Sequence, residues 1–323
     1  MMMKKDRKHL AAIALALALA VSGCGSGAGE ESTGASGSDG SGTESSTGSV
    51  LTPDKPQLAE GIVNLSEQVS RVDIPTTEMS PDHGTALSGS GIRMLDQLIK
   101  TTGDPKANYL ISPTSLQMAL GMTVTGADAG TATEKELMAV LMPGTDGRPD
   151  TLNEEMATFA NRMLHSDGVS WNVANSIWVR NNINVALRDS YVSDVTNSYA
   201  AELFSAPFDQ STLDSINSWV NTNTKERIPK ILDKLDQNAA HFRAMLTEES
   251  AEVKIGTVIH KTMIKVDRKG TVAAASTTVE MRTKGAVMTE PPYQVILDRP
   301  FVYGIVDAAT GVPVFLGVQN KMN

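Results

Sequence analysis

A run of small, uncharged residues followed by basic ones is the part of this chain with the clearest chemical use. From Gly270 to Val279 there is no charge, no proline and no bulky aromatic side chain. Alternate side chains in this run would share one face of an extended strand. The run could therefore lie outside a sheet or enter one as a new strand. Arg282 and Lys284 follow it and offer peptide bonds that a protease could cleave.

The sequence contains no catalytic or metal-binding constellation that we recognise. Its five histidines show no metal-ligand spacing, and neither H-E-x-x-H nor G-x-S-x-G occurs. The single cysteine, Cys24, can form neither an intrachain disulfide nor a cysteine metal cluster. We therefore expect a protein that is not an enzyme and needs no cofactor.

Composition and charge predict one acidic domain. The 323 residues carry a formal net charge of −9, with a pI near 5.1. Nucleic acids and anionic membranes select clustered Lys and Arg, and no such cluster occurs beyond the N-terminus. Residues 24–88 are expected to form a low-complexity tether and a poorly ordered segment. That leaves roughly 235 residues, 89–323, for one domain of ordinary size.

The N-terminus predicts export. Basic residues between Lys4 and Lys8 precede an apolar run, residues 10–21, that is too short to span a membrane. The following V-S-G-C resembles the bacterial lipoprotein box, which implies removal of residues 1–23 and a lipid on Cys24. A plain signal peptide is the alternative. We expect an extracellular protein, anchored to the bacterial cell membrane through Cys24, with residues 25–49 as a solvated tether.

Hydrophobic periodicity predicts helices first and strands last, which indicates an α+β domain. We expect a first helix over 90–101, with Ile92, Leu95, Leu98 and Ile99 on one face. Further helices are expected at 115–124, from 133 onward, at 152–164, and at 214–235 with an interruption at Pro229. Residues 173–179 favour a strand. Residues 252–318 favour strands and loops, ending in two apolar strands around a Thr310–Gly311 turn.

Five segments in order resemble the serpins, serine protease inhibitors that trap their target by inserting a cleaved loop as a new strand. The segments are residues 107–141, 173–180, 197–209, 216–232 and 259–267. The resemblance implies N-terminal helices and a mainly antiparallel main sheet with an exposed reactive loop. In that fold 173–180 is a central-sheet strand, 197–209 the edge strand, 216–232 the helix covering the sheet, and 259–267 the strand feeding the loop.

The resemblance also implies roles for single residues of the loop. The hinge is formed by Gly270, Thr271, Ala273, Ala274 and Ala275. Counting forward from the hinge by the family's loop length places the reactive bond between Lys284 and Gly285, which suits a trypsin-like protease with an acidic specificity pocket. Counting backward from Pro291 and Pro292 places it between Met288 and Thr289 instead.

Three residues outside the loop resemble polar positions where the family's sheet opens. They are Ser112, Asn175 and His260. An ordinary hydrogen-bonded core residue is an equally good interpretation of each.

The chain also departs from the family pattern. Arg268 stands where an acidic residue is usual, Val272 stands where Glu is frequent, and TKERI (224–228) replaces Thr-x-Gly-Lys-Ile. Near 236–238 a large block is missing, including a strand that borders the insertion slot. The sequence therefore leaves two functions open: a membrane-anchored suicide-substrate inhibitor of serine proteases, or a non-inhibitory remnant that binds or scaffolds at the surface. A third possibility is that the natural protein is longer and contains the block.

Overall fold

The computed structural model describes residues 56, 58–70, 72, 78–165, 173–181, 187–235 and 297–321, together with the backbone of four short strands. The helices are α1 (Pro81–Thr102), α2 (Pro113–Thr125), α3 (Ala132–Leu141), α4 (Pro149–Leu164), α5 (Asp189–Tyr199) and α6 (Gln210–Asn223). A 3-10 turn, η1, spans Leu65–Gln68. The strands with described side chains are β2 (Val63–Asn64), β3 (Tyr109–Ile111), β4 (Asn175–Arg180), β5 (Ala201–Ala206), β9 (Phe301–Val306) and β10 (Pro313–Gln319). The four backbone-only strands are β1 (Ala18–Leu19), β6 (Ile259–His260), β7 (Lys265–Asp267) and β8 (Gly270–Val272).

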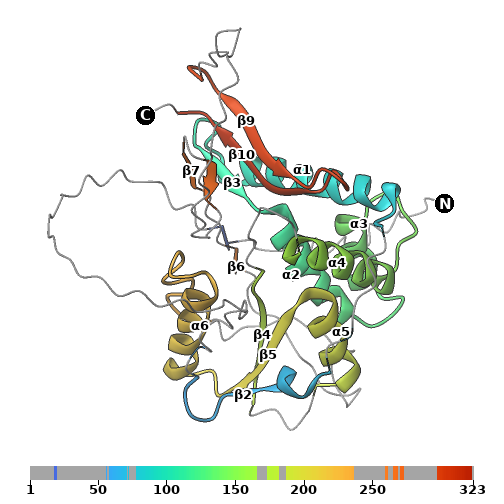
Figure 1. Ribbon diagram of the computed structural model, residues 1–323, viewed down its shortest axis with the longest axis vertical. Helices are drawn as coiled ribbons and strands as arrows, with labels where there is room; N and C mark the ends of the chain where they lie inside the picture. Colours follow the sequence, from blue (N-terminus) through green and yellow to red (C-terminus); the bar gives the residue numbers. More distant parts are fainter. Residues whose placement is uncertain are drawn as a thin grey trace, which may run out of the picture.

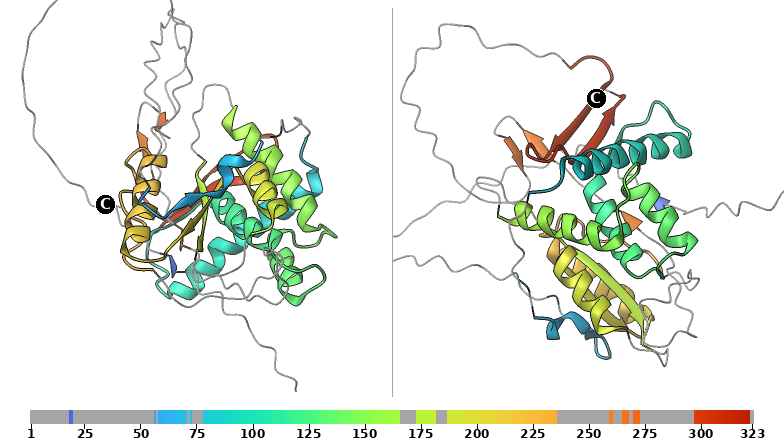
Figure 2. Two further views of the ribbon diagram at one scale, coloured as in Figure 1. Left: turned by 90° about the horizontal axis from the view of Figure 1, so that it is seen from below. Right: turned by 90° about the vertical axis from the view of Figure 1, so that its right-hand side faces the viewer.

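Two three-stranded sheets organise the described part of the molecule (Figures 1 and 2). In the first, β10 lies between β3 and β9 and is antiparallel to both. In the second, β5 lies between β2 and β4, parallel to β4 and antiparallel to β2. Helix α2 lies at the centre and contacts α1, α3, α4, α5 and β10. The mixed α+β class predicted from the sequence is therefore confirmed.

Local capping signals explain where several helices begin and end. Proline at the first turn starts α1, α2 and α4, where a missing N–H costs nothing. The Ser112 hydroxyl caps α2, and the Thr131 hydroxyl caps α3 by accepting from the N–H of Glu134. Gly103, with φ of 73°, ends α1 in the left-handed conformation. The helices predicted at 115–124, from 133, and at 152–164 are confirmed.

The first helix is longer than predicted, and the prediction of its buried face was partly wrong. It begins at Pro81 rather than at residue 90. Leu95 and Leu98 are buried, whereas Ile92 is 61% exposed. The buried face carries small residues in place of further large apolar ones: a Cβ on Gly91 would lie 2.7 Å from the Cβ of Pro113. Close helix packing through glycine leaves no hydrophobic signal, so the periodicity missed the first turns.

The helix predicted over 214–235 ends at Asn223, and Pro229 lies beyond it. Lys225 and Glu226 have φ of 51° and 62°, a left-handed conformation that an α-helix cannot continue through. The N–H of Glu226 donates to the carbonyl of Asn221 at 2.8 Å. Glu226 thus has a backbone conformation that favours glycine.

The segment from 197 to 209 was expected to contain an edge strand, and this was wrong. Val63 and Asn64 pair with Ser205 and Phe204 on the outer side of β5. Side chains on either side of Val63 and Asn64 in the sequence also pack on the described core, namely Leu58, Ile62, Leu65 and Val69. The packed part of the chain therefore extends N-terminal of residue 89.

The main core lies between α2, α4, α5 and the two sheets. Fully buried members include Leu87, Val124, Leu141, Leu152, Met156, Phe159, Val195, Tyr199 and Leu203. Burying a side chain of this size contributes about 1.5–3 kcal/mol. In the described part of the chain, no helix is both long and apolar enough to cross a membrane.

Candidate functional site

The first two residues of the predicted hinge, Gly270 and Thr271, lie in a two-stranded hairpin. β7 and β8 pair in antiparallel register, with Lys265 opposite Val272 and Asp267 opposite Gly270. The strand opened by Gly270 therefore runs back along the strand that precedes it. A two-stranded hairpin is only marginally stable by itself. Opening this pairing to release the strand would therefore cost little.

Most of the predicted loop lies outside the described residues. This applies to the hinge residues Ala273, Ala274 and Ala275, to both predicted reactive bonds (Lys284–Gly285 and Met288–Thr289), and to the lipidation residue Cys24. These assignments stay predictions. His260 is placed only by its backbone, in β6, where it pairs with Leu19 of β1. Cleavage before Cys24 would remove β1, so a processed chain would lack this pairing.

β4 is fixed to the core from both faces. Asn175, at its start, is buried and donates from Nδ2 to the Tyr199 carbonyl at 2.7 Å. On the other face Trp178 stacks on Phe204 with ring centroids 4.3 Å apart. Phe204 in turn meets Trp219 of α6 edge-on, at 6.3 Å. These contacts hold β4 and β5 as one unit under α6.

One edge of β4 is taken by β5, and no strand of the described part of the chain pairs with the other edge. The hairpin β7–β8 forms a separate sheet. Among the described strands β4 therefore ends its sheet, and an added strand could pair along this side.

Ser112 and Asn175 both border α2, but they do not meet. Ser112 Oγ accepts from the N–H of Ser115 at 3.3 Å, which caps the helix. Asn175 approaches the same helix through Met118, with Nδ2 3.5 Å from Sδ. Ser112 and Met118 are six residues apart, or about 9 Å along the helix axis. Each side chain thus makes its own hydrogen bond, Ser112 with α2 and Asn175 with the end of α5.

A buried polar cluster that sequence reasoning missed lies behind β4. The Tyr199 hydroxyl donates to Asn153 Oδ1 at 2.6 Å, and Thr125 Oγ1 donates to the same oxygen at 2.8 Å. Burial raises the pKa of Tyr199 above its usual value, although hydrogen bonding with Thr125 acts the other way. The tyrosine ring packs on Gly121, where a Cβ would lie 2.5 Å from the hydroxyl. Asn153 lies on the buried side of α4, next to Leu152 and Met156. A polar residue at an apolar position of the helical pattern is the sequence signal that could have identified this cluster.

The described residues contain no group of three or more His, Cys, Asp or Glu side chains placed to hold a metal ion.

Comparison with protein families matches two segments of the chain to one family. The family described as Serpin (serine protease inhibitor) matches residues 85–241 and 235–321. The two matches meet near 236–238, the position of the predicted deletion.

Curated relatives match over part of their length. Human (Homo sapiens) glia-derived nexin is 29% identical over 170 residues, which cover 49% of this chain and 40% of that protein. The putative serpin-Z12 of Oryza sativa subsp. japonica is 48% identical over 63 residues, or 20% of this chain and 14% of that protein. An alpha-1-antitrypsin homolog of Cyprinus carpio is 44% identical over 72 residues, 22% and 18% of the two chains. The chain therefore spans less than half the length of these relatives.

Solved structures extend the likeness to most of the described fold. The thermophilic serpin tengpin in its native state has a TM-score of 0.60 at 20% identity, covering 81% of this chain and 100% of that chain. An Arabidopsis serpin in its native stressed conformation has a TM-score of 0.57 at 14% identity, covering 76% and 99%. At these identities the likeness shows the fold alone.

Proposed function

Because this chain belongs to the serpin family, we propose that it is a suicide-substrate inhibitor of serine proteases. Serpins are generally protease inhibitors rather than catalysts. In the proposed reaction a protease cleaves after Lys284, remains attached to the chain as an acyl-enzyme, and is carried along as the segment from Gly270 enters the sheet. Lysine at this position suits trypsin-like enzymes.

One observation carries this proposal: among the described strands, β8 pairs with β7 alone, and β4 ends its sheet with no described strand beyond it. The residues after Gly270 are uncharged and mostly small, so alternate side chains could pass between packed elements. The 14 residues between the hinge and the bond would span about 46 Å at roughly 3.3 Å per residue. That travel is long enough to displace a bound protease from its docked position.

A covalent complex with trypsin tests the proposal. We expect a band that survives denaturing electrophoresis and equals the summed masses of the protease and the cleaved inhibitor. Lys284→Gln should abolish the band, and the matched variant Met288→Gln should leave it. Ala275→Arg should convert the protein into a substrate that is cut without trapping, because a charge on the inserting face cannot be buried in the sheet. Cleavage of the unaltered chain without a complex would reject inhibition.

We also propose that the domain is anchored outside the cell membrane through Cys24. The V-S-G-C sequence after a short apolar run supports this. Expression in a bacterial host with an alkyne-tagged fatty acid should label the protein, and Cys24→Ala should remove the label. Equal labelling of the Cys24→Ala variant would contradict the anchor.

A specific observation favours a second function, a non-inhibitory surface binding or scaffold protein. β4 and the β7–β8 hairpin lie in separate sheets, so an entering segment would lack a partner for half of its backbone groups. Buried unpaired amides cost about 1–3 kcal/mol each. Thermal unfolding before and after loop cleavage separates the two functions. A large gain in melting temperature indicates insertion, whereas an unchanged value indicates the remnant.

A further inference from the structure

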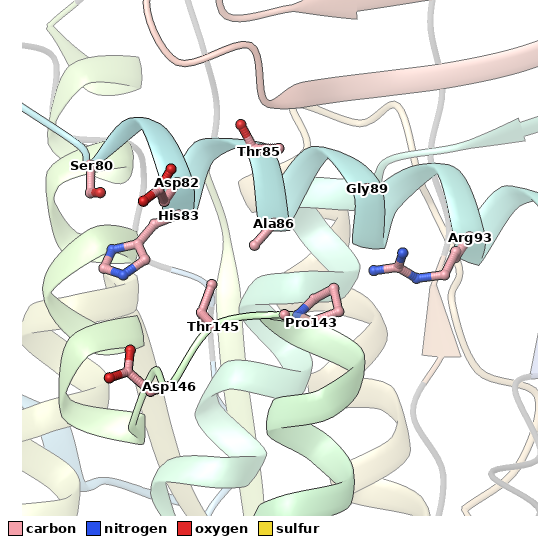
Figure 3. A pocket seen from close by; sticks show the side chains of 11 residues that line it. Ser80, Asp82, His83, Thr85, Ala86, Gly89, Arg93, Pro143, Thr145 and Asp146 are labelled. Carbon is pink, nitrogen blue, oxygen red and sulfur yellow. The ribbon is translucent and has the colours of Figure 1, made fainter.

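A polar groove runs along the N-terminal half of α1, away from the proposed reactive loop. It has a volume of about 860 Å³ and lies between α1 and the α3–α4 connection at residues 143–146 (Figure 3). On the helix side it is lined by Asp82, Ala86, Gly89 and Arg93, which follow one another at helical spacing along one stripe. A volume of this size is typical of a ligand site.

The two ends of the groove carry opposite charge. Arg93 lies at one end, and Figure 3 shows its guanidinium turned back along the helix toward Pro143. Asp82 and Asp146 lie at the other end, beside His83. None of these three charged side chains has a hydrogen bond or ion pair with the described residues. The Arg93 guanidinium lies beside Gly89, seven residues from Asp82, so the charged groups are about 10 Å apart along the helix axis.

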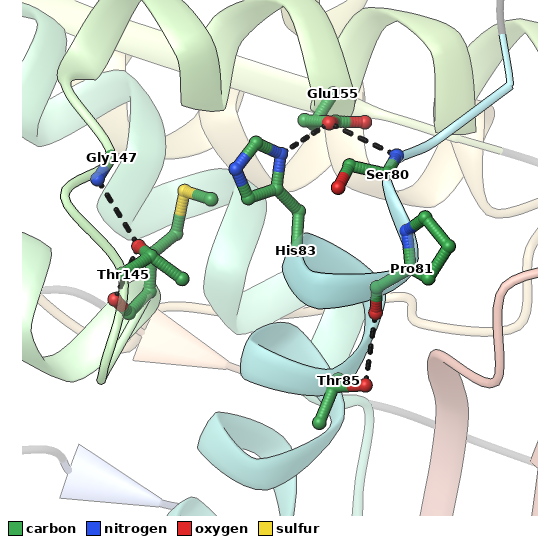
Figure 4. A network of polar contacts seen from close by, with 8 residues as sticks. Ser80, Pro81, His83, Thr85, Thr145, Gly147 and Glu155 are labelled. Carbon is green, nitrogen blue, oxygen red and sulfur yellow. Dashed lines mark hydrogen bonds and ion pairs between the residues drawn. The ribbon is translucent and has the colours of Figure 1, made fainter.

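The walls are held in place by contacts of their own. His83 Nδ1 lies 2.5 Å from Glu155 Oε1 on α4, and the N–H of Ser80 donates to the same oxygen at 3.3 Å (Figure 4). Across the groove, Thr145 Oγ1 accepts from the N–H of Gly147 at 3.2 Å and donates to the Met142 carbonyl at 2.8 Å. The charged ends are thus placed on a structured frame, which lowers the ordering cost of binding.

The middle of the groove is floored by small residues. Ala86 is buried, and Gly89 presents only backbone. A Cβ built on Gly89 would meet only the Arg93 guanidinium, at 3.6 Å from Nη1 and 3.8 Å from Nη2. The Arg93 guanidinium therefore lies over Gly89, and a larger side chain at this position would displace the guanidinium from the groove.

We propose that this groove binds a short zwitterionic peptide. The α-ammonium group sits between Asp82 and Asp146, and the terminal carboxylate accepts hydrogen bonds from the Arg93 guanidinium, a pairing that can be bidentate. Three extended residues span about 10 Å at 3.3 Å each, which matches the separation of the charged groups along α1. A polyanion such as a nucleic acid fits poorly, because it would meet the two carboxylates. This site is independent of the inhibitory reaction.

Titration calorimetry with uncapped trialanine tests the site on the full-length protein. We expect saturable one-to-one binding with a Kd on the order of 1 mM. Arg93→Ala should weaken binding at least about tenfold, and so should amidation of the peptide's C-terminus. Combining the two changes should add little, because both remove the same contact. Acetylating the N-terminus should weaken binding to the unaltered protein and to Arg93→Ala alike.

Two further variants keep the test decisive. Gly89→Leu should abolish binding while raising the melting temperature, since leucine favours a helix and its Cβ meets only Arg93. Arg148→Ala is the matched control, because this exposed arginine pairs with Asp150 outside the groove lining. No saturation by about 10 mM peptide, or equal affinity in Gly89→Leu, would overturn the proposal.

Discussion

Placing a methyl group on Gly121 should destabilise the protein although it improves helix propensity. Gly121 is buried in α2, and its Cα faces the ring of Tyr199 at the end of α5. An added Cβ would lie 2.5 Å from the tyrosine oxygen and 2.7 Å from Cε1. Both contacts are well inside van der Waals distance, and the ring is fully buried. Either the ring or one of the two helices has to move.

The size of the effect follows from three contributions. Overpacking a dense core costs about 1–3 kcal/mol. Moving the ring breaks the 2.6 Å hydrogen bond from Tyr199 to Asn153 and leaves a buried hydroxyl unpaired, at about 1–3 kcal/mol. Replacing a helical glycine with alanine returns about 1 kcal/mol. We expect a net loss of about 3 kcal/mol, or about 6–12 °C in melting temperature for a domain of this size.

The assay is urea unfolding of Gly121→Ala beside Gly89→Ala. The second variant is the matched control, since a Cβ on Gly89 meets nothing closer than 3.6 Å. It should stabilise the protein by up to about 1 kcal/mol. The difference between the two variants then isolates the clash with Tyr199. Equal unfolding midpoints for the two variants would refute this account of the core.

Three other predictions follow from backbone strain and from titrating groups. Glu226→Gly should stabilise the protein by about 1 kcal/mol in urea unfolding, because the exposed Glu226 has φ of 62°, while Glu226→Ala keeps the Cβ and should give no gain. Stability should fall above pH 10, because burial raises the folded-state pKa of Tyr191 and Tyr199. The hydroxyl groups of these tyrosines then lose their protons at a lower pH in the unfolded chain than in the folded one, which favours unfolding. Each tyrosine then contributes a loss of about 1.4 kcal/mol per pH unit, measured as the urea midpoint against pH. Burial raises the pKa of Asp307, but Thr310 and Arg162 outweigh it and hold the pKa below its usual value. Asp307→Asn should therefore lower the free energy of unfolding by up to about 1 kcal/mol at pH 7, a small value because solvent screens the pair with Arg162. This difference should fade below about pH 4, because protonation of Asp307 removes the same stabilisation from the unaltered protein.

Each of these predictions has an outcome that contradicts it. If Glu226→Gly and Glu226→Ala have the same midpoint, strain at this residue is not the cause. Phenolate absorbance from all five tyrosines of the folded protein at pH 11 would show that none is protected. A cost of Asp307→Asn that stays constant down to pH 3 would exclude a role for the carboxylate charge.

Several elements could be read from the chain because their signals are local. Pro113 preceded by a capping serine marks the start of α2, and apolar density marks its length. β9 and β10 flank a turn in which Gly311 has φ of 72°, a conformation that favours glycine. The uncharged run after Gly270 is visible in the sequence alone. Propensity, capping and turn chemistry act over a few residues, so no partner has to be known.

Other features depended on partners far away in the chain. Val63 and Asn64 are ordinary residues in the sequence, and they became a strand because β5 offered an edge about 140 residues later. The start of α1 went unrecognised because its glycines pack closely: a Cβ on Gly84 would lie 2.7 Å from the carbonyl oxygen of Thr310. The peptide groove needs α1 and the α3–α4 connection side by side before its separated charges face one space. Local free energies select helix, strand or turn, but long-range packing decides which surfaces meet, and therefore where a site can form.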